Sequence, residues 1–289
     1  MFVYWNDNTF EIKDQSEYVF FDRGFQFGDG VYETIAVKKG KPVFIIDHLN
    51  RLFDDSRRID LQVKQTLLQW TEKIEELIQK NEIKEGFVKI IITRGSAGNC
   101  GLSYMELENT SVFITAQNCH FQQLKEKKPY RVLISQLERR NPNSVVTYTK
   151  TLNYLSNIIA RNEADIKECD EAILVNVEGN ICEGTTSNIF FVDDDLKIST
   201  PEVKSGLLNG IVRTKVIKAA VELGIEVVEE VLSPEKFKTT KGCFLTSSLL
   251  DITPVKELYN EVHYRYADYE NVLERIDERY RSYIDYGHL

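Results

Sequence analysis

The sequence predicts a mixed α+β protein with two domains, and three observations lead to this prediction. The chain has 289 residues, of which 42% are apolar and 11% aromatic, enough to build a hydrophobic core. At about 150 residues per domain, this length indicates two domains or one large one. Strand-like segments alternate with amphipathic helical segments, most regularly in the second half of the chain, as they do in mixed α/β folds.

The first third of the chain is expected to begin with strands. Phe2–Trp5 and Tyr18–Phe21 have the composition of short strands. Val31–Val37 and Pro42–Ile46 are expected to form a strand pair, because Lys39-Gly40 between them is typical of a hairpin turn.

Helices are expected after this hairpin. Asp47 is placed to cap a helix that runs to about Ile59. Thr66–Asn81 brings its apolar residues onto one helical face, which predicts a second helix. Two more strands should follow, at Phe87–Thr93 and Ser111–Ala116.

Two polar stretches interrupt these elements. Arg94–Asn109 is rich in Gly, Ser and Asn and is expected to be a loop. Gln117–Lys128 contains a Lys-Glu-Lys-Lys run and ends at Pro129, so we interpret it as the connection between the domains. The expected division is an N-terminal α/β domain over 1–117, a linker over 118–128 and a C-terminal α/β domain over 129–289.

The second half alternates strands and helices. Gly224 is expected to end one helix, and Glu178-Gly179-Asn180 is expected to be a turn. The expected strands are Tyr130–Ile134, Glu171–Val177, Asn188–Val192, Ile225–Val231 and Gly242–Thr246, with a hairpin near Asp251–Leu258. The expected helices are Leu152–Ile166, Leu208–Leu223 and Tyr269–Tyr283.

Composition argues against several classes of protein. Lys plus Arg is 36 and Asp plus Glu is 45, a formal charge of −9, which disfavours a general binder of nucleic acid or anionic membranes. The chain contains no apolar run of about 18 residues and no signal-peptide pattern. The five cysteines are scattered and form no CxxC pair, so we expect neither a disulfide framework nor a zinc site, and a cytoplasmic location.

Other sequence motifs of catalysis are also missing. The four histidines are far apart and share no metal-ligand spacing. Gly28-Asp29-Gly30 begins like a dinucleotide-binding loop, but Glu33 stands where the third glycine would be. The chain has neither a P-loop nor a Gly-x-Ser-x-Gly elbow. Metal hydrolysis, nucleotide binding and serine hydrolysis are therefore disfavoured.

Several short segments that carry glycines, hydroxyls and charged residues remain. In chain order they are 22–33, 47–52, 150–155, 183–188, 208–213 and 246–248. Together they resemble those of the class IV aminotransferases, fold-type IV enzymes that use pyridoxal 5′-phosphate. That family includes branched-chain and D-amino-acid aminotransferases and aminodeoxychorismate lyases. The resemblance runs from about Trp5 to about Val255. It implies the D-amino-acid aminotransferase-like fold, with the cofactor at the domain interface.

Lys150 falls where the family has its Schiff-base lysine. The resemblance implies that its amine condenses with the cofactor aldehyde and then moves the substrate α-proton as a general base and acid. Such an amine must be partly neutral, so its pKa should be lowered by burial and by the cationic cofactor ring. Taken alone, Lys150 could equally be a surface lysine beside a helix.

Two further residues match groups around the cofactor ring. The resemblance makes Glu183 the carboxylate that faces the pyridine nitrogen and keeps it protonated. It makes Tyr154 the tyrosine that hydrogen-bonds the cofactor phenolic oxygen. The alternatives are a turn carboxylate after Asn180 and an ordinary helix tyrosine.

The phosphate site is also given by the resemblance. Arg51 matches the phosphate-binding arginine; otherwise it would pair with Asp47 or Asp55 on its own helix. The helix that starts near Gly210 would offer free backbone N–H groups. The remaining expected cofactor contacts are Thr186, Leu208, Ile211, Val212, Ser247 and Ser248, with Val212 standing where many relatives carry Thr.

On the substrate side the resemblance is weaker. Tyr32 matches an aromatic residue that lines the substrate pocket. Lys89 lies near the position of a branched-chain enzyme arginine, and Arg94 begins the variable loop. The Arg-x-His that traps the carboxylate in the D-amino-acid enzymes is absent from 96–100. These departures weaken both assignments.

Three hypotheses follow. The first is an aminotransferase for a small, aliphatic or branched-chain-like amino acid with a 2-oxo acid as acceptor. The second is an aminodeoxychorismate lyase, which the segments around Arg94, Arg140 and Thr200–Ile211 resemble somewhat better. The third is a non-catalytic relative that keeps only the fold. The family resemblance also implies a homodimer, with the Arg94–Asn109 loop beside the other subunit's pocket.

Overall fold

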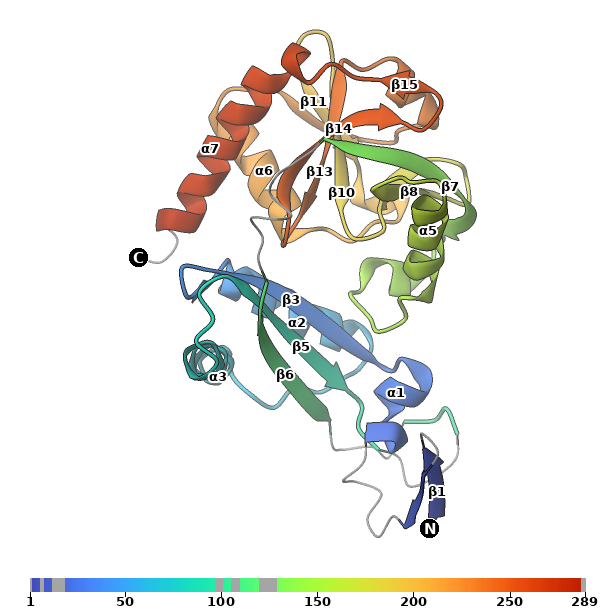
Figure 1. Ribbon diagram of the computed structural model, residues 1–289, viewed down its shortest axis with the longest axis vertical. Helices are drawn as coiled ribbons and strands as arrows, with labels where there is room; N and C mark the ends of the chain where they lie inside the picture. The colour runs from blue at the N-terminus through green and yellow to red at the C-terminus, as the bar shows by residue number, and fades with distance from the viewer. Residues whose placement is uncertain are drawn as a thin grey trace.

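A computed structural model describes residues 2–5, 8–11, 19–96, 101–104, 110–119 and 129–286. Two separate sheets, of four and nine strands, form an N-terminal and a C-terminal part with helices packed against each (Figure 1). The predicted α+β class is therefore confirmed. The division at 118–128 stays a prediction, since most of that stretch lies outside the described residues.

The N-terminal part is built on an antiparallel sheet with the order β4-β3-β5-β6. Alternate residues of β3 and β5, such as Val31 and Ile90, are fully buried against the two helices α2 and α3, as period-two patterning requires. The elements are β3 (Gly30–Lys38), β4 (Lys41–Pro42), α2 (Ile45–Arg58), α3 (Leu67–Lys80), β5 (Gly86–Thr93) and β6 (Ser111–Asn118). A small pair, β1 (Phe2–Trp5) and β2 (Asn8–Glu11), and α1 (Arg23–Phe27) precede them.

Three predictions in this part are wrong. Val19–Phe21 is a 3-10 helix and not a strand. The strand expected at Pro42–Ile46 ends at Pro42, because its apolar residues begin the helical face of α2. Asp47 does not cap α2; it lies in the first turn and pairs with Lys215 (2.9 Å). By contrast, Thr66 caps α3 with a capping box.

The shortness of β4 has a consequence for the rest of the molecule. β4 pairs only with the last two residues of β3, so the remaining edge of β3 is open to another segment. The Lys150–Leu152 segment fills it: the Tyr32 N–H donates to the Lys150 carbonyl (2.9 Å), and the Leu152 N–H donates to the Gly30 carbonyl (3.0 Å). A Cβ on Gly30 would lie 2.5 Å from the Ile92 carbonyl oxygen of β5 and 2.9 Å from the Leu152 Cδ1, so glycine lets both neighbours approach this position closely.

The C-terminal part contains the second sheet, in the order β12-β11-β10-β13-β14-β7-β8-β9, with β15 paired to β14. Its core includes a stacked pair, Phe190 and Phe244, with ring centroids 4.9 Å apart. The strands are β7 (Tyr130–Arg140), β8 (Glu171–Asn176), β9 (Ile181–Gly184), β10 (Asn188–Val192), β11 (Ile198–Pro201), β12 (Val227–Glu230), β13 (Gly242–Ser247), β14 (Asp251–Leu258) and β15 (Val262–His263). The helices are α5 (Leu155–Ile166), α6 (Ile211–Glu222) and α7 (Glu270–Tyr286).

The predicted elements here differ from the observed ones at helix starts, in short strands and in β7, which was expected to end at Ile134 but runs to Arg140. α5 begins at Leu155 and not at Leu152, because the preceding residues pair with β3. α6 begins at Ile211, with Gly210 as its N-cap. The four-residue strands β9 and β11 were not expected; every residue in them is buried, so they show no alternation.

None of the helices in the described ranges combines the length and apolar character that crossing a membrane would require.

Candidate active site

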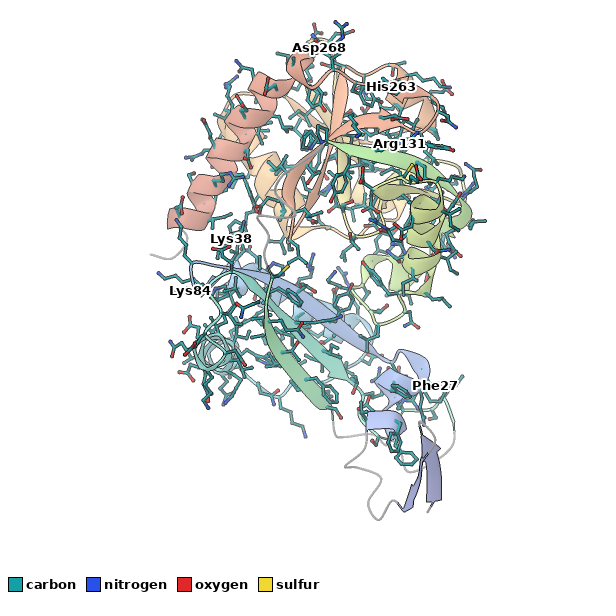
Figure 2. The ribbon with its side chains drawn as sticks, viewed as in Figure 1. Phe27, Lys38, Lys84, Arg131, His263 and Asp268 are labelled. Carbon is teal, nitrogen blue, oxygen red and sulfur yellow. The ribbon has the colours of Figure 1, made fainter. Side chains whose placement is uncertain are left out.

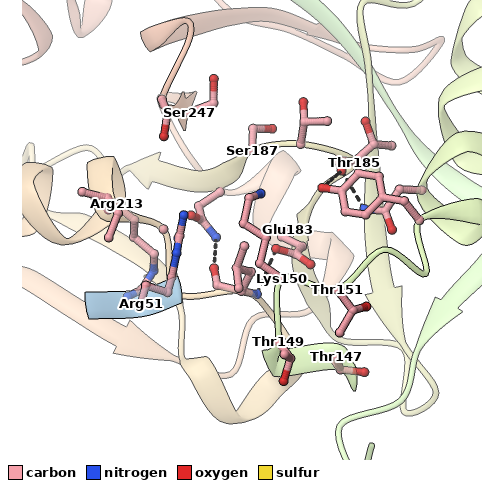
Figure 3. A pocket seen from close by; sticks show the side chains of 18 of the residues that line it. Arg51, Thr147, Thr149, Lys150, Thr151, Glu183, Thr185, Ser187, Arg213 and Ser247 are labelled. Atoms are coloured by element: carbon pink, nitrogen blue, oxygen red, sulfur yellow. Dashed lines mark hydrogen bonds between the residues drawn. The ribbon is translucent and has the colours of Figure 1, made fainter. Parts of the chain in front are cut away.

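A pocket lies where the two parts meet, with about 710 Å³ of space not filled by protein atoms, open solvent at its mouth included. Its walls come from α2, from the segment around Lys150, from the turn after β9, from the start of α6 and from the β13–β14 turn. Figure 3 shows the Lys150 side chain extending between Arg51 on one side and Thr185 on the other. Every residue expected to contact the cofactor lines this pocket: Arg51, Lys150, Tyr154, Glu183, Thr186, Leu208, Gly210, Ile211, Val212, Ser247 and Ser248.

Lys150 occupies the centre of the site. Its Nζ lies 3.4 Å from the Tyr32 hydroxyl and 4.4 Å from the centre of the Tyr32 ring. Removal from bulk water and the nearby Arg51 charge lower the pKa of its amine to about 8. At pH 7.5, a pKa of about 8 leaves roughly a quarter of the amine neutral, against about one part in a thousand at 10.5. The amine is therefore available as a nucleophile and base.

Two tyrosines frame this amine. The Tyr32 and Tyr154 rings meet edge to face, with centroids 5.5 Å apart. The Tyr154 hydroxyl donates to the Thr185 carbonyl (3.2 Å). Burial raises the pKa of both hydroxyls, so both remain protonated at neutral pH.

The Glu183 carboxylate is held from both sides. Oε1 accepts from Arg140 (2.7 Å), and Oε2 accepts from the Leu208 N–H (3.0 Å). Burial raises the pKa of Glu183, while Arg140 and the Leu208 N–H act in the opposite direction. The orientation of this carboxylate in the pocket is therefore fixed. Arg140 belongs to a segment that resembles the lyases, but it is not among the site residues expected from the sequence.

Arg51 is paired with a residue that sequence reasoning did not single out. Its Nε and Nη2 donate to both oxygens of Glu33 on β3 (2.6 and 3.0 Å), so the expected alternative of a partner on its own helix is wrong. The buried His48 contacts the same carboxylate through Nδ1 (2.8 Å). Burial opposes ionisation, but the Arg51 and His48 contacts hold the pKa of Glu33 well below its usual range.

One end of the pocket offers hydrogen-bond donors without partners. Gly210 caps α6 without any side-chain hydrogen bond, so the N–H groups of the first turn face the pocket. The buried Thr246 hydroxyl has no hydrogen-bond partner, and Ser247 and Ser248 lie beside it. Glycine is needed at position 210, because a Cβ there would lie 2.2 Å from the Asn188 Oδ1. These donors, together with Arg51, fit a phosphate group.

The turn after β9 is anchored by a second carboxylate that was missed. Glu171 is buried, and its oxygens accept from the Thr185 hydroxyl and N–H and from the Ser187 hydroxyl (2.9 Å). Asn157 donates to the Thr185 carbonyl (2.6 Å). The sequence could have indicated this role, because Glu171 begins a strand whose next four residues are apolar. A glutamate buried in such a strand needs internal hydrogen-bond partners.

The three expected substrate residues are not all placed together. None of them is among the residues that line the pocket, although Tyr32 touches Lys150, and the exposed Lys89 lies over the Tyr32 ring with Nζ 5.2 Å from its centre. Arg94 is buried and does not line the pocket. Its guanidinium donates to the Asp29 carboxylate (3.0 Å) and to the carbonyls of Ile59 and Asp60. Its geometry is that of a structural arginine in the N-terminal part.

Comparison with known proteins agrees with the geometry of the site. The family model described as amino-transferase class IV matches residues 30–258. A protein of Methanocaldococcus jannaschii, provisionally named a branched-chain-amino-acid aminotransferase, is 31% identical over 91% of this chain and 89% of its own.

Other relatives carry different names. A D-alanine aminotransferase of Bacillus licheniformis is 27% identical, over 82% of this chain and 81% of its own. A solved structure from Legionella pneumophila, provisionally named a 4-amino-4-deoxychorismate lyase, has a TM-score of 0.80 and 26% identity, and the match covers 91% of this chain and 97% of that one. These three names imply three reactions, so similarity alone does not select the substrate.

The buried His48 should make stability depend on pH. Burial lowers the pKa of His48 from its usual 6.5. Below pH 6.5 the unfolded chain therefore binds a proton at this histidine more readily than the folded protein does. Unfolding free energy should therefore fall from pH 7 to pH 5, by at most about 1.4 kcal/mol per pH unit for one proton. His48→Asn keeps an N–H donor for Glu33 but cannot titrate, so its denaturation curves should show a smaller loss.

The matched control is His263→Asn, because the His263 side chain is 79% exposed. This variant should keep the wild-type pH dependence. Equal slopes in wild type and His48→Asn would show that His48 is not the titrating group.

Proposed function

Because this chain belongs to the class IV aminotransferases, which use pyridoxal 5′-phosphate, we propose that it transfers the amino group of a small aliphatic amino acid to a 2-oxo acid. One observation carries this proposal. The Lys150 amine, with its pKa lowered to about 8, lines a pocket that also contains an oriented carboxylate and hydrogen-bond donors suited to a phosphate, among them the buried Thr246 hydroxyl, which has no partner in the described part of the chain.

Each part of the cofactor has matching residues in this proposal. Arg51, the first turn of α6 and the hydroxyls of Ser247 and Ser248 would hold the phosphate. Glu183, fixed by Arg140, would pair with the ring nitrogen. Tyr154 and Leu208 would contact the ring, and Lys150 would bind the aldehyde carbon.

The proton transfer belongs to the Lys150 amine. When bound, pyridoxal phosphate supplies an electron sink that stabilises negative charge at the substrate α-carbon. Once the substrate amine has displaced it from the aldehyde carbon, Lys150 Nζ would take the α-proton and deliver it to that cofactor carbon, since an amine with a pKa of about 8 both accepts and releases protons near neutral pH. The Lys150 amine donates to the Tyr32 hydroxyl (3.4 Å), a contact that restrains the position of the amine.

The substrate preference is inferred from the residues around Tyr32. This ring is an apolar wall for a small side chain, and the exposed Lys89 amine beside it is a cation for the substrate carboxylate. The Arg-x-His trap of the D-amino-acid enzymes has no counterpart in 96–100. An aliphatic L-amino acid is therefore the favoured donor.

A lyase remains the second candidate, because the segments around Arg94, Arg140 and 200–211 resemble aminodeoxychorismate lyases. Both reactions begin by removing the α-proton at Lys150. They differ in the next event, which would be transfer of the proton to the cofactor carbon in the aminotransferase and loss of a β-substituent in the lyase. A non-catalytic relative would have no need for the combined set of Lys150, Glu183 and Arg51.

A donor panel separates these candidates. With 2-oxoglutarate as acceptor, L-leucine should give glutamate at a rate at least about tenfold above D-alanine. The same protein should release no pyruvate from aminodeoxychorismate. Pyruvate release without any amino transfer from L-leucine, L-glutamate or D-alanine would instead establish the lyase.

We also propose a homodimer in which a second copy covers the mouth of the pocket. Large apolar side chains are exposed on β7, on the 3-10 turn Val145–Tyr148 and on α5, and Val146 among them lines the pocket. They are Leu137, Val145, Val146, Leu155 and Ile158. The Arg94–Asn109 loop, which the family resemblance places beside the partner's pocket, lies partly outside the described residues.

Light scattering tests this assembly. The wild type should have twice the mass of one chain, and Ile158→Glu should shift it toward the monomer because a charge would be buried in the interface. Val221→Glu, at a similarly exposed position on α6 (58% against 59%), is the matched control and should leave the mass unchanged. A monomeric wild type would contradict the proposal.

The cysteines support a further proposal, a cytoplasmic location. Cys119, Cys169, Cys182 and Cys243 are free thiols, as expected in a reducing compartment. Cell fractionation would test it, and recovery of the protein outside the cytoplasm would contradict it.

A further inference from the structure

A buried polar cluster connects the two parts of the protein outside the pocket. Lys38, the last residue of β3, extends its amine to both oxygens of Asp251 (2.7 and 2.8 Å). The Tyr280 hydroxyl on α7 donates to the same carboxylate (2.9 Å). Asp251 is 0% exposed. Figure 2 shows Lys38 at the edge of the N-terminal part that faces the C-terminal part.

Asp251 lies at a sensitive point of the fold. It is the first residue of β14 and pairs with Ser247, so it closes the turn that carries Ser247 and Ser248 into the pocket. Its φ is +56°, a left-handed conformation that costs a residue with a side chain free energy. Within the turn, the N–H of Leu250, the residue before Asp251, donates to the Ser247 hydroxyl (3.2 Å).

The cluster therefore holds the turn in a conformation that it would not favour alone. A buried carboxylate without its cation is strongly destabilised. Loss of Lys38 would thus favour movement of Asp251 toward water, and the hydroxyls of the turn would move with it. A neighbouring contact supports the same interface, since the Phe44 ring at the start of α2 lies 6.0 Å from the Tyr280 ring.

We propose that Lys38, Asp251 and Tyr280 form an interdomain latch that positions the Ser247–Ser248 turn and thereby sets how tightly the cofactor phosphate is held. This inference rests on the proposed function, because it assumes that these hydroxyls bind the phosphate. The three latch residues are positioning residues and touch neither cofactor nor substrate. Through Lys38, the strand that carries Tyr32 also controls the opposite wall of the site.

The experiment compares binding of pyridoxal 5′-phosphate with binding of pyridoxal, which lacks the phosphate. Both bind covalently through their aldehyde, and absorbance titration of the cofactor-stripped full-length protein measures both affinities. In Lys38→Met the dissociation constant for pyridoxal 5′-phosphate should rise about tenfold, since coupling through packed networks changes affinity by this order. The constant for pyridoxal should change less than twofold.

Two further variants make the test specific. Lys38→Arg keeps the charge and should restore at least half of the lost phosphate preference. Lys39→Met is the matched control, because the adjacent Lys39 side chain is 84% exposed and pairs only with the exposed Asp285 among the residues described. It should behave as the wild type for both ligands.

The possible outcomes are distinct. Equal weakening of both ligands in Lys38→Met would mean a general structural defect and would overturn the latch, as would no weakening at all. If Lys38→Met does not fold, Tyr280→Phe replaces it and should show the same selective loss, about threefold. A wild type that binds neither aldehyde would refute the proposed function itself and not the latch alone.

Discussion

The open edge of β3 is the constraint on which the site depends. Since β4 covers only the last residues of that strand, the segment that carries Lys150 completes the edge with its own backbone hydrogen bonds. Asp55 on α2 strengthens this contact by accepting the Lys150 N–H (3.0 Å). The reactive amine thus belongs to the C-terminal part but is positioned by the N-terminal sheet, and the pocket exists only where the two meet.

The charges of the site are arranged around this amine. Arg51 is neutralised by Glu33 and Arg140 by Glu183, whereas Lys150 has no ion-pair partner among the residues that the structure describes. Desolvation without a paired anion lowers the pKa of an amine, and Lys150 follows this rule. The two ion pairs also orient the groups that face the cofactor. The same electrostatic design therefore provides both binding and reactivity.

The elements and the pocket-lining residues could be predicted from the sequence better than the partners of those residues. The amphipathic pattern of Thr66–Asn81 predicted helix α3. The residues expected to contact the cofactor line one pocket. Glu33, Glu171 and Asp251 were not foreseen, because their importance comes from burial and long-range pairing that no local pattern encodes. The contacts of Arg94 could not be predicted for the same reason. Its partners lie on other elements, including Asp29 and the end of α2.

The most direct test of the role proposed for Lys150 is chemical. Holoenzyme saturated with pyridoxal 5′-phosphate is reduced with borohydride, digested and mapped by mass spectrometry, with Lys150→Ala treated in parallel. We expect one stoichiometric phosphopyridoxyl modification, on the peptide that contains Lys150, and none in the variant. An unmodified Lys150 in the reduced wild type, or stoichiometric modification of a different lysine, would contradict it.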